Sequence, residues 1–579
     1  MAKFTTRPVI MGKHGVIAAG HYLAAAAGFG IFLKGGNAID AAVAAGFAET
    51  VVEPQENGIG GEAPILVYSA DGKRVAAVNG QGIAPKRATV EWFKNEGIDV
   101  IPGDGFLPAT VPGALDSWVT ALANFGTMSL QQVIEPALEL AENGYPIYPR
   151  LRNTISTNAE KYKSRWPTTA KIYMLDGNVP DEGYILRNPD LAVTFRRLID
   201  AERKGSRAGR KAGLEAARDE FYKGEIARRI ADFAAENEVL DSSGKKHRGL
   251  IRYEDLADYH ARLEEPVSVD YRGYRVYKCG PWCQGPVFLQ QLTILEGYNL
   301  ASLGHNSPNY IHTVIEAAKL AFADRDAYYG DPQFVRVPLD RLLSKEYAAG
   351  RRKLIDPEVA SLELRPGGGR SIRLEQGRSY PGIYVGDTTK VDAIDRWGNM
   401  ISATPSGGWI PTSPVIEGLG FPLGTRGQMF SLDPKHPNAL MPGKRPRTTL
   451  TPSLVTKDGL PFMVFGTPGG DCQDQWALLF FLNFIDFGMS LQEAVDAPLF
   501  HTTHFPSSFY PRHASPGHIG LEGRIPAQVR EALAAKGHKV NVGEEWAGGK
   551  ILAVRFDHRT GLIQGAASPR VETGYAIGW

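Results

Sequence analysis

Two hydroxyl residues, Thr388 and Ser406, lie at equal distances from a single turn in the sequence. The turn signal is RWGN at 396–399, and counting nine residues from Trp397 reaches Thr388 in one direction and Ser406 in the other. If the two strands of this hairpin stay in register, the hydroxyls face each other with about 4.5–5.5 Å between their Cβ atoms. Such a pair could serve as a nucleophile with a supporting hydroxyl. The same pattern would also fit hydroxyl residues on a solvent-exposed strand face.

A second predicted hairpin places two more hydroxyls beside a glycine turn. Its turn is KDG at 457–459, and symmetric counting puts Thr448 opposite Gly469 and Thr449 opposite Pro468. The double threonine of RPRTTLTP would then lie next to the turn GTPGGD. Threonine pairs are common in strands because branched side chains favour the extended backbone, so this pair alone is a weak signal.

The GTPGGD turn leads into a helix that we expect to begin near Cys472, with Asp471 as a candidate cap. Glycines in the turn would let the backbone N–H groups of Gly469 and Gly470 point outward at a helix N-terminus. That arrangement stabilises an oxyanion. A Gly-Gly pair is also often only a turn.

Thr388 needs activation to act as a nucleophile, because a threonine hydroxyl alone reacts poorly near neutral pH. It becomes competent when its own α-amine is freed to serve as a base. Freeing that amine requires cleavage of the bond between Asp387 and Thr388. If Thr388 is the nucleophile, this bond has to be cut before the chain can act on a substrate.

The elements that must position these residues change in character along the chain. Before residue 386 the pattern is mainly helical, and beyond it the chain is expected to form hairpins and one buried helix. Asn37 is the cap candidate for the first buried helix. The main predicted elements are helices at 38–50, 115–125, 130–143, 310–328 and 476–488, and two short strands on either side of Asp71-Gly72.

Two polar segments are predicted to lie at the surface. Residues 195–249 are rich in charge, but acidic and basic residues alternate and apolar residues recur at helical spacing, which favours solvated helix faces over a basic binding patch. Residues 363–382 are rich in Gly and Arg without periodicity, so we expect a mobile surface linker there.

The composition excludes some classes of function. The chain has 579 residues, of which 43% are hydrophobic and 22% are charged, as is ordinary for a globular protein. A net charge of +1 gives no electrostatic case for binding nucleic acid or an acidic membrane surface. We see no signal peptide and no uninterrupted apolar run of about 18 residues, so we expect no membrane span and a cytoplasmic location.

The chain has 3 cysteines, and this small and odd number argues against a disulfide-stabilised domain. Cys279 and Cys283 could hold a metal ion or form a disulfide, but no second Cys/His pair complements them. Two ordinary thiols are the favoured interpretation. We predict neither a metal ion nor a cofactor.

From Gly15 onward the chain resembles the γ-glutamyltranspeptidase family. The resemblance is carried by many blocks in one order, which makes it specific. It implies a four-layer αββα sandwich, an α+β fold of the N-terminal-nucleophile hydrolase type, and a precursor that splits itself. The blocks are GGNAIDAAVA (35–44), EPQENGIGG (53–61), NGQGIAPKRAT (79–89), VPGALDSW (111–118), FYKGEIA (221–227), EPVSVDYRGY (265–274), KLAFADRDAYYGDP (319–332), GDTTKVDAID (386–395), GKRPRTTLTP (443–452), GTPGG (466–470) and GAASPR (565–570).

The resemblance assigns roles to the residues already singled out. It implies that Thr388 is the nucleophile, that Gly469 and Gly470 donate to the oxyanion, and that Ser406 supports the nucleophile. Thr448 and Thr449 take the place of paired serines near the bound substrate carboxylate, and the cut falls between Asp387 and Thr388. Residues 1–387 would form a large subunit and 388–579 a small one. Together the subunits would build one αββα domain and could pair further as a dimer of heterodimers.

The sequence departs from the family at three positions that hold a γ-glutamyl head group. Val90 stands where an Arg grips the substrate α-carboxylate, and Met429 stands where an Asp binds the α-amine. Gly408 replaces an Asn two residues past the supporting hydroxyl. GTPGGDCQDQ and FSLDPKHPNAL instead resemble the acylase-like and oxamate-amidohydrolase-like branches.

The leading hypothesis is therefore an amidohydrolase that acts on a small non-glutamyl amide through an acyl-enzyme. Arg426 and Arg447 could hold a single substrate carboxylate, as an oxamate-like amide would need, and Trp409 could instead wall an apolar acyl pocket. The alternative is a γ-glutamyl hydrolase or transferase that acts on glutathione-like substrates. A third option is a catalytically silent relative that only binds small molecules or partners.

Overall fold

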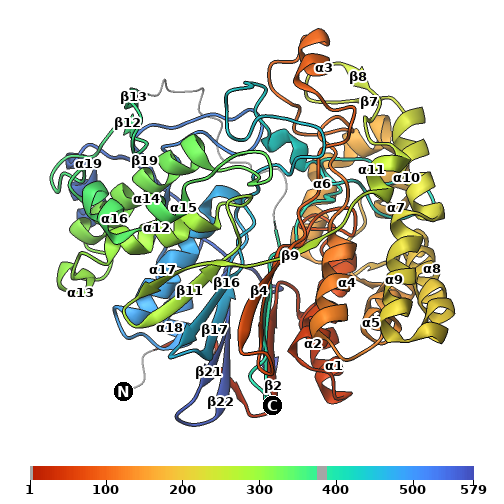
Figure 1. The fold of residues 1–579 in the computed structure, drawn as a ribbon, viewed down its shortest axis with the longest axis horizontal. Helices are drawn as coiled ribbons and strands as arrows, with labels where there is room; N and C mark the ends of the chain where they lie inside the picture. Colours follow the sequence, from red (N-terminus) through yellow and green to blue (C-terminus); the bar gives the residue numbers. More distant parts are fainter. Residues whose placement is uncertain (1–3, 374–387) are drawn as a thin grey trace.

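The computed structural model describes residues 4–373 and 388–579. Within these ranges, two antiparallel sheets of seven strands each form the middle of the molecule (Figure 1). In spatial order the first sheet is β1 (Ile10–Gly12), β22 (Leu562–Ala567), β21 (Leu552–Asp557), β17 (Leu460–Gly466), β16 (Ser453–Lys457), β11 (Tyr274–Lys278) and β10 (Val267–Tyr271). The second is β23 (Tyr575–Gly578), β2 (Gly15–Ala19), β14 (Val391–Asp395), β15 (Met400–Ala403), β3 (Ile65–Ser69), β4 (Arg74–Asn79) and β9 (Arg262–Glu264).

The two sheets pack face to face because their strands carry apolar side chains on alternate positions. Leu66 of the second sheet and Leu454 of the first belong to one buried cluster between the sheets. Along β14, Ile394 joins that cluster, whereas Val391 and Ala393 face the helices on the other side. This alternation buries the strand on both faces.

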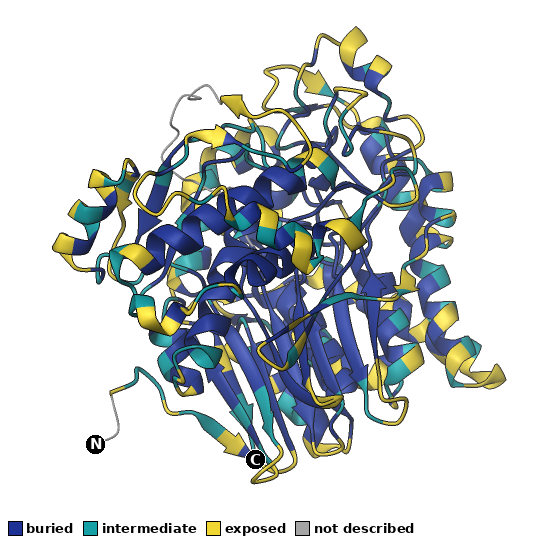
Figure 2. Ribbon diagram, turned by 60° about the vertical axis from the view of Figure 1, so that its left-hand side comes forward, coloured by how far each residue is buried: buried dark blue, intermediate teal, exposed yellow. Residues whose placement is uncertain are grey.

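A helix layer covers the outer face of each sheet (Figures 1 and 2). The predicted capped helix is confirmed as α2, since the Asn37 side chain accepts hydrogen bonds from the backbone N–H groups of Ile39 and Asp40. On the second sheet lie α1 (Tyr22–Leu33), α2 (Ala38–Val52), α4 (Ala114–Phe125) and α5 (Leu130–Asn143), with α8 (Pro189–Gly205), α9 (Arg210–Tyr222) and α10 (Glu225–Glu236) outside them. On the first sheet lie α12 (Gly285–Leu295), α14 (Pro308–Tyr328), α17 (Gln473–Ile485) and α18 (Leu491–Asp496).

Shorter elements complete the chain. The remaining helices are α3 (Val90–Asn95), α6 (Pro149–Arg165), α7 (Pro167–Tyr173), α11 (Tyr253–Ala257), α13 (Leu300–Leu303), α15 (Leu339–Leu342), α16 (Lys345–Arg352) and α19 (Ala527–Ala535), with 3₁₀ turns η1 (Ser206–Ala208), η2 (Arg426–Met429) and η3 (Gly470–Cys472). The small strands are β5 (Tyr145–Pro146), β6 (Ile185–Leu186), β7 (Val239–Leu240), β8 (Lys246–His247), β12 (Glu363–Leu364), β13 (Ile372–Arg373), β18 (Phe500–Thr502), β19 (His518–Leu521) and β20 (Lys539–Val542).

These layers confirm the four-layer αββα sandwich. The charged segment 195–249 forms the outer helices α8 to α10, whose exposed sides are visible in Figure 2. The linker prediction for 363–382 was wrong in part, because β12 and β13 pair as a small hairpin, and residues from 374 onward lie outside the described ranges. All three cysteines are buried free thiols.

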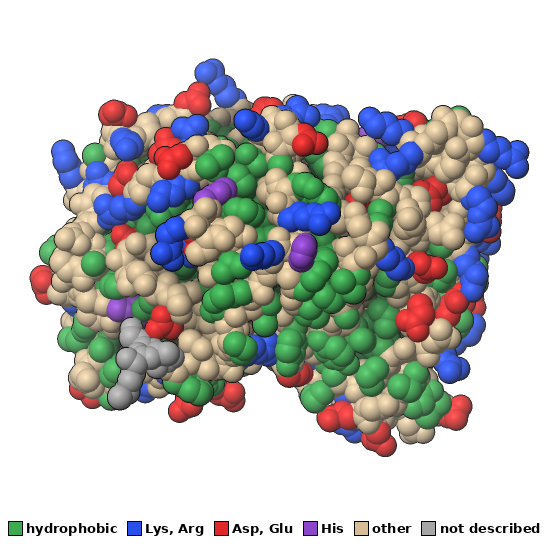
Figure 3. All heavy atoms as spheres, turned by 90° about the horizontal axis from the view of Figure 1, so that it is seen from below, with side chains coloured by type: hydrophobic (Ala, Val, Ile, Leu, Met, Phe, Trp, Pro, Cys, Tyr) green, Lys and Arg blue, Asp and Glu red, His purple; other side chains and the backbone are tan. Residues whose placement is uncertain are grey.

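The surface carries charges of both signs. On the face drawn in Figure 3, Lys and Arg side chains are interspersed with Asp and Glu and with apolar side chains. Within the described ranges, no helix is both long and apolar enough to cross a membrane.

Candidate active site

The predicted register of the first hairpin is confirmed. β14 pairs with β15 from Val391↔Ala403 to Ile394↔Met400, which places the centre of the turn at residue 397. Beyond the regular strands, Thr388 and Ser406 form an isolated antiparallel bridge. Their hydroxyl oxygens lie 3.1 Å apart, and both residues are buried. The turn symmetry therefore placed the two hydroxyls correctly.

Ser406 also pairs with a loop from the N-terminal part of the chain. Its backbone exchanges two hydrogen bonds of 2.9 Å with Glu62. Arg426 in η2 donates from Nη2 to Ser406 Oγ at 2.7 Å and forms an ion pair with the Glu62 carboxylate through Nε. Burial raises the pKa of Glu62, and the positive charge of Arg426 opposes that rise. Glu62 was not foreseen from the sequence.

Trp409 packs against this ion pair. The Arg426 guanidinium carbon lies 4.8 Å from the centroid of the Trp409 ring. The indole N–H donates to the backbone oxygen of Glu56 at 2.7 Å, and the side chain is fully buried. The structure therefore brings Trp409, Arg426 and Ser406 together.

The glycine turn adopts backbone angles that suit glycine. Gly469 has φ +128° and Gly470 has φ +54°, both in the region that side chains disfavour. The prediction that Asp471 caps the following helix was wrong. Cys472 occupies the cap position of α17 without a side-chain cap, and the Asp471 carboxylate instead accepts from the backbone N–H of Ser508 at 2.8 Å.

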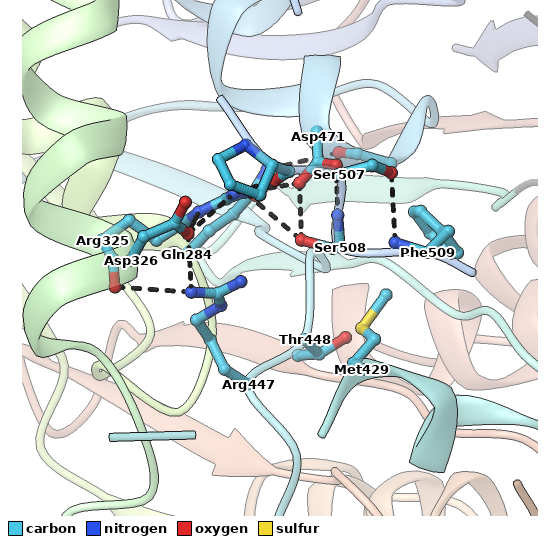
Figure 4. Close-up of polar contacts among 12 residues, drawn as sticks. Gln284, Arg325, Asp326, Met429, Arg447, Thr448, Asp471, Ser507, Ser508 and Phe509 are labelled. Atoms are coloured by element: carbon cyan, nitrogen blue, oxygen red, sulfur yellow. Dashed lines mark hydrogen bonds and ion pairs between the residues drawn. The ribbon is translucent and has the colours of Figure 1, made fainter. Parts of the chain in front are cut away.

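A buried polar network holds this turn in place (Figure 4). Arg325, on α14, forms ion pairs with Asp471 and Asp326, and its side chain is fully buried. Gln284 donates to the backbone oxygen of Gly470 at 3.2 Å and accepts from Arg325 Nη1 at 3.1 Å. The peptide of Gly470 is thus tied to α14 through one amide side chain and one guanidinium.

The predicted pairing of Thr448 with Gly469 and of Thr449 with Pro468 was wrong. The regular ladder of β16 and β17 ends at Ser453↔Phe465 after a register shift. Thr448 instead exchanges backbone hydrogen bonds of 2.9 Å with Trp282 and Gln284. Its neighbour Thr449 keeps a buried hydroxyl oxygen that has no hydrogen-bond partner among the described residues.

Arg447 lies beside this network. Its Nη1 is 3.0 Å from Asp326 Oδ1, and burial, together with the charge of Arg325, lowers its pKa to about 10. Figure 4 shows the Arg447 side chain directed at Asp326, with Thr448 and Met429 nearby. Met429 is fully buried, and Val90 lies in a buried apolar cluster.

Carboxylates that the sequence analysis missed surround Thr389. The Thr389 hydroxyl lies 3.1 Å from Glu49 and 2.7 Å from Glu53, and both carboxylates are buried. Glu53 shares a small cavity with Thr388 and Lys550. For Glu53, the two glutamates of the EPQENGIGG block (53–61) were the available sequence signal, whereas Glu49 lies before that block.

One cluster among the described residues has the composition of a metal site. His312, Glu316 and His538 are buried, and their potential ligand atoms lie within 4.8 Å of one another. The Glu316 carboxylate, however, is already paired with Lys319 at 2.6 Å and Arg365 at 3.0 Å. The positive charges of these two side chains would repel a metal ion at the same carboxylate, so a metal site here is disfavoured.

The family model of γ-glutamyltranspeptidase matches residues 24–578. The chain belongs to this family. An acylase ACY 1 proenzyme of Pseudomonas sp. (strain SE83) is 36% identical over 97% of this chain and 93% of its own length. A glutathione hydrolase proenzyme of Pseudomonas sp. (strain A14) is 33% identical over 98% of this chain and 94% of its own length. The crystal structure of a cephalosporin acylase from Bacillus halodurans superposes with a TM-score of 0.84, at 32% identity, over 100% of this chain and 98% of the other.

Membership of the γ-glutamyltranspeptidase family agrees with the four-layer αββα sandwich described above. This chain is an enzyme of the amidohydrolase and γ-glutamyltransferase type with the N-terminal-nucleophile hydrolase fold. Of the two residues at the predicted cut, Thr388 is described, whereas Asp387 lies outside the described ranges.

Proposed function

We propose that this member of the γ-glutamyltranspeptidase family cuts itself before Thr388 and then uses Thr388 to hydrolyse a small non-glutamyl amide. The observation that carries the proposal is the 3.1 Å contact between the hydroxyls of Thr388 and Ser406 at the start of β14. Pro468, which leads into the Gly469-Gly470 turn, lines the same cavity as Thr388. This shared cavity supports the assignment of Thr388 as the nucleophile and of the neighbouring Gly469 and Gly470 as the oxyanion donors.

Self-cleavage needs only groups of the chain and one water. Thr388 Oγ1 attacks the carbonyl carbon of Asp387, the C–N bond breaks, and the hydroxyl proton passes to the departing nitrogen. Water then splits the resulting ester, which leaves a carboxylate on Asp387 and a free α-amine on Thr388. That amine serves as the base for later turnovers.

Hydrolysis of the substrate repeats the same bond changes. The α-amine takes the proton of Thr388 Oγ1 as the oxygen attacks the amide carbon, and then passes it to the leaving amine. The N–H groups of Gly469 and Gly470 stabilise the oxyanion, and water releases the acid from the acyl-enzyme. Ser406 supports the attacking oxygen.

The two products of self-cleavage, residues 1–387 and 388–579, would remain one heterodimer. β14 of the small part pairs with β2 of the large part, and β16 of the small part pairs with β11 of the large part. Both sheets thus contain strands from each side of the cut. Two such heterodimers could associate further. The proenzyme names of the Pseudomonas relatives support the cleavage.

The substrate is proposed to carry one negative charge or none. A γ-glutamyl head group has both a carboxylate and an ammonium, and burial of either without a partner costs several kcal/mol. Val90 and Met429, which the sequence resemblance puts in place of the family's two ionic partners, are apolar and buried. Neither can supply the missing ionic contact.

The charges around Arg447 favour a single carboxylate. Among five side chains here, the buried Arg325 and Arg447 and the partly buried Arg512 lie near Asp326 and Asp471, which leaves one positive charge in excess within this set. An oxamate-like acid amide would neutralise it. Thr448, Thr449 and Trp409 would then border the acyl group, and Arg426 remains a second candidate for its carboxylate.

The alternative function is γ-glutamyl hydrolysis or transfer, which the 33% identity to a glutathione hydrolase favours. A panel of γ-glutamyl anilide, glutathione, oxamate, cephalosporin side-chain amides and simple acyl amides separates the two. We expect kcat/KM for γ-glutamyl anilide to fall about two to four decades below that of the best non-glutamyl amide, since two ionic contacts are missing. Glutathione as the best substrate would establish the alternative.

A further inference from the structure

Arg426 restricts the direction of the hydroxyl proton of Ser406. An arginine side chain has only donors, so the 2.7 Å contact from Arg426 Nη2 must occupy a lone pair of Ser406 Oγ. The hydrogen on Ser406 Oγ therefore cannot point at Arg426. Thr388 Oγ1, at 3.1 Å, lies within reach of that hydrogen.

We propose that Arg426 is a positioning residue for Thr388, which it controls through Ser406, and that Glu62 holds Arg426 in place for this task. The inference rests on the proposed function, because it needs Thr388 to be the nucleophile. It assigns the Glu62–Arg426 ion pair to self-cleavage as well as to turnover.

The surroundings of Arg426 restrict it to one orientation. Its Nε binds Glu62, its Nη2 binds Ser406, and its guanidinium lies 4.8 Å from the centroid of the Trp409 ring. The side chains of Arg426 and Glu62 are each 1% exposed. Glu62 is itself fixed, because its backbone exchanges two hydrogen bonds with Ser406. The ion pair and the hydroxyl that it directs therefore belong to one rigid unit.

The chemical consequence is a donor aimed at the attacking oxygen. As Thr388 Oγ1 loses its proton, negative charge develops on it, and the Ser406 O–H stabilises that charge. The cation on the far side of Ser406 polarises the O–H bond and strengthens the donor. Loss of a hydrogen bond to a charged group corresponds to a rate loss of roughly 10- to 100-fold.

A competing role for Arg426 is direct contact with the substrate. Its Nη1 is buried and has no hydrogen-bond partner among the described residues, so it could meet a substrate carboxylate. Self-cleavage separates the two roles, because that reaction uses the Thr388 oxygen but involves no substrate. A substrate contact alone would change KM and leave self-cleavage intact.

The test follows self-cleavage of the pulse-labelled full chain, made by cell-free translation, on a denaturing gel. The variants are Arg426→Met, Arg426→Lys, Ser406→Ala and the double variant of Arg426→Met with Ser406→Ala. We expect Arg426→Met to slow cleavage roughly 10- to 100-fold and Arg426→Lys to restore most of the rate, because lysine keeps the charge and a donor. The double variant should cleave no more slowly than Ser406→Ala.

Two results would overturn the inference. One is cleavage of Arg426→Met at the wild-type rate with only KM for substrate raised. The other is multiplication of the two losses in the double variant, which would show that Arg426 acts without Ser406.

Controls separate this role from folding and from the proposed function. Arg351→Met removes another buried arginine, which lies 3.5 Å from Asp324, and should leave cleavage unchanged. If Arg426→Met is insoluble, Arg426→Gln takes its place, and its cleavage rate is compared with that of Arg426→Lys. A wild-type chain that never cleaves would refute the role of Thr388, whereas a cleaving wild type with unaffected Arg426 variants would refute only the role of Arg426.

Discussion

The hydroxyl of Thr389 lies 2.7 Å from a carboxylate oxygen of Glu53. The same hydroxyl lies 3.1 Å from Glu49, and the two glutamates are buried side by side. Burial, together with the charge of Glu56, raises the pKa of Glu53 to about 7, and burial and Glu53 raise that of Glu49 well above its ordinary range. The residue next to the proposed nucleophile thus rests on a carboxyl pair that retains protons near neutral pH.

Thr389→Ala should separate this structural role from the chemistry at Thr388. We expect Thr389→Ala to cleave itself but to lose about 1–3 kcal/mol of unfolding free energy, because the buried carboxyl pair loses a donor. Thr388→Ala should remain uncut and inactive at near wild-type stability. A denaturing gel measures the cleavage of both variants, and urea unfolding measures their unfolding free energies. Equal loss of cleavage in both would mean that the attacking hydroxyl is misassigned.

Glu53 should make stability depend on pH. Its pKa of about 7 in the folded chain lies above its ordinary value of 4.5, so the folded state keeps a proton that the unfolded state releases. This contribution to stability is fully present below pH 4.5 and is lost as pH rises through 7. The wild type should therefore lose unfolding free energy relative to Glu53→Gln between pH 4.5 and 8. A difference that stays constant across this range would show that Glu53 ionises normally.

Gly470→Ala should impair catalysis beyond its effect on folding. Gly470 has φ +54°, and a Cβ there would lie 2.8 Å from the Phe509 ring. Gly459→Ala is the matched control, because Gly459 has φ +76° but nothing within 4 Å. Both variants should lose about 1–2 kcal/mol from the left-handed backbone. Alanine keeps the amide N–H, but the Cβ contact with Phe509 should displace the turn, so only Gly470→Ala should also lose kcat, by roughly 100-fold, if this amide serves the oxyanion. Equal kcat in the two variants would argue against that role.

Chelators should leave activity unchanged. Glu316 in the His312–Glu316–His538 cluster is already paired with Lys319 and Arg365, and no step proposed for Thr388 involves a metal ion. Activity should be compared before and after dialysis against a strong chelator, with the metal content of the protein measured in parallel. Loss of activity that zinc restores would contradict this expectation.

Local patterns in the sequence predicted part of the site. The Thr388–Ser406 contact followed from the symmetry of one tight hairpin, since each strand residue is fixed by its distance from the turn. The same counting failed for Thr448, because a register shift between Val455 and Thr456 and the end of the ladder break the symmetry. Thr448 then pairs with a segment around Cys283.

Contacts between distant segments were beyond such reasoning. Glu62 and Arg426 are 364 positions apart, and no spacing rule links them. The partners of Asp471 show the same limit. Its place before a helix favoured a cap, whereas in the fold the carboxylate pairs with Arg325 and accepts from the backbone N–H of Ser508. The burial of Glu49 and Glu53 likewise depends on how α2 packs under Thr389.

The most direct test of the account is the mass and N-terminal sequence of the purified mature protein. Cleavage before Thr388 predicts two fragments of 387 and 192 residues (579 − 387 = 192), the smaller of which begins at Thr388. The two should copurify, because strands from both fragments share each sheet. An intact chain of 579 residues, or a new N-terminus at any residue other than Thr388, would contradict the central claim.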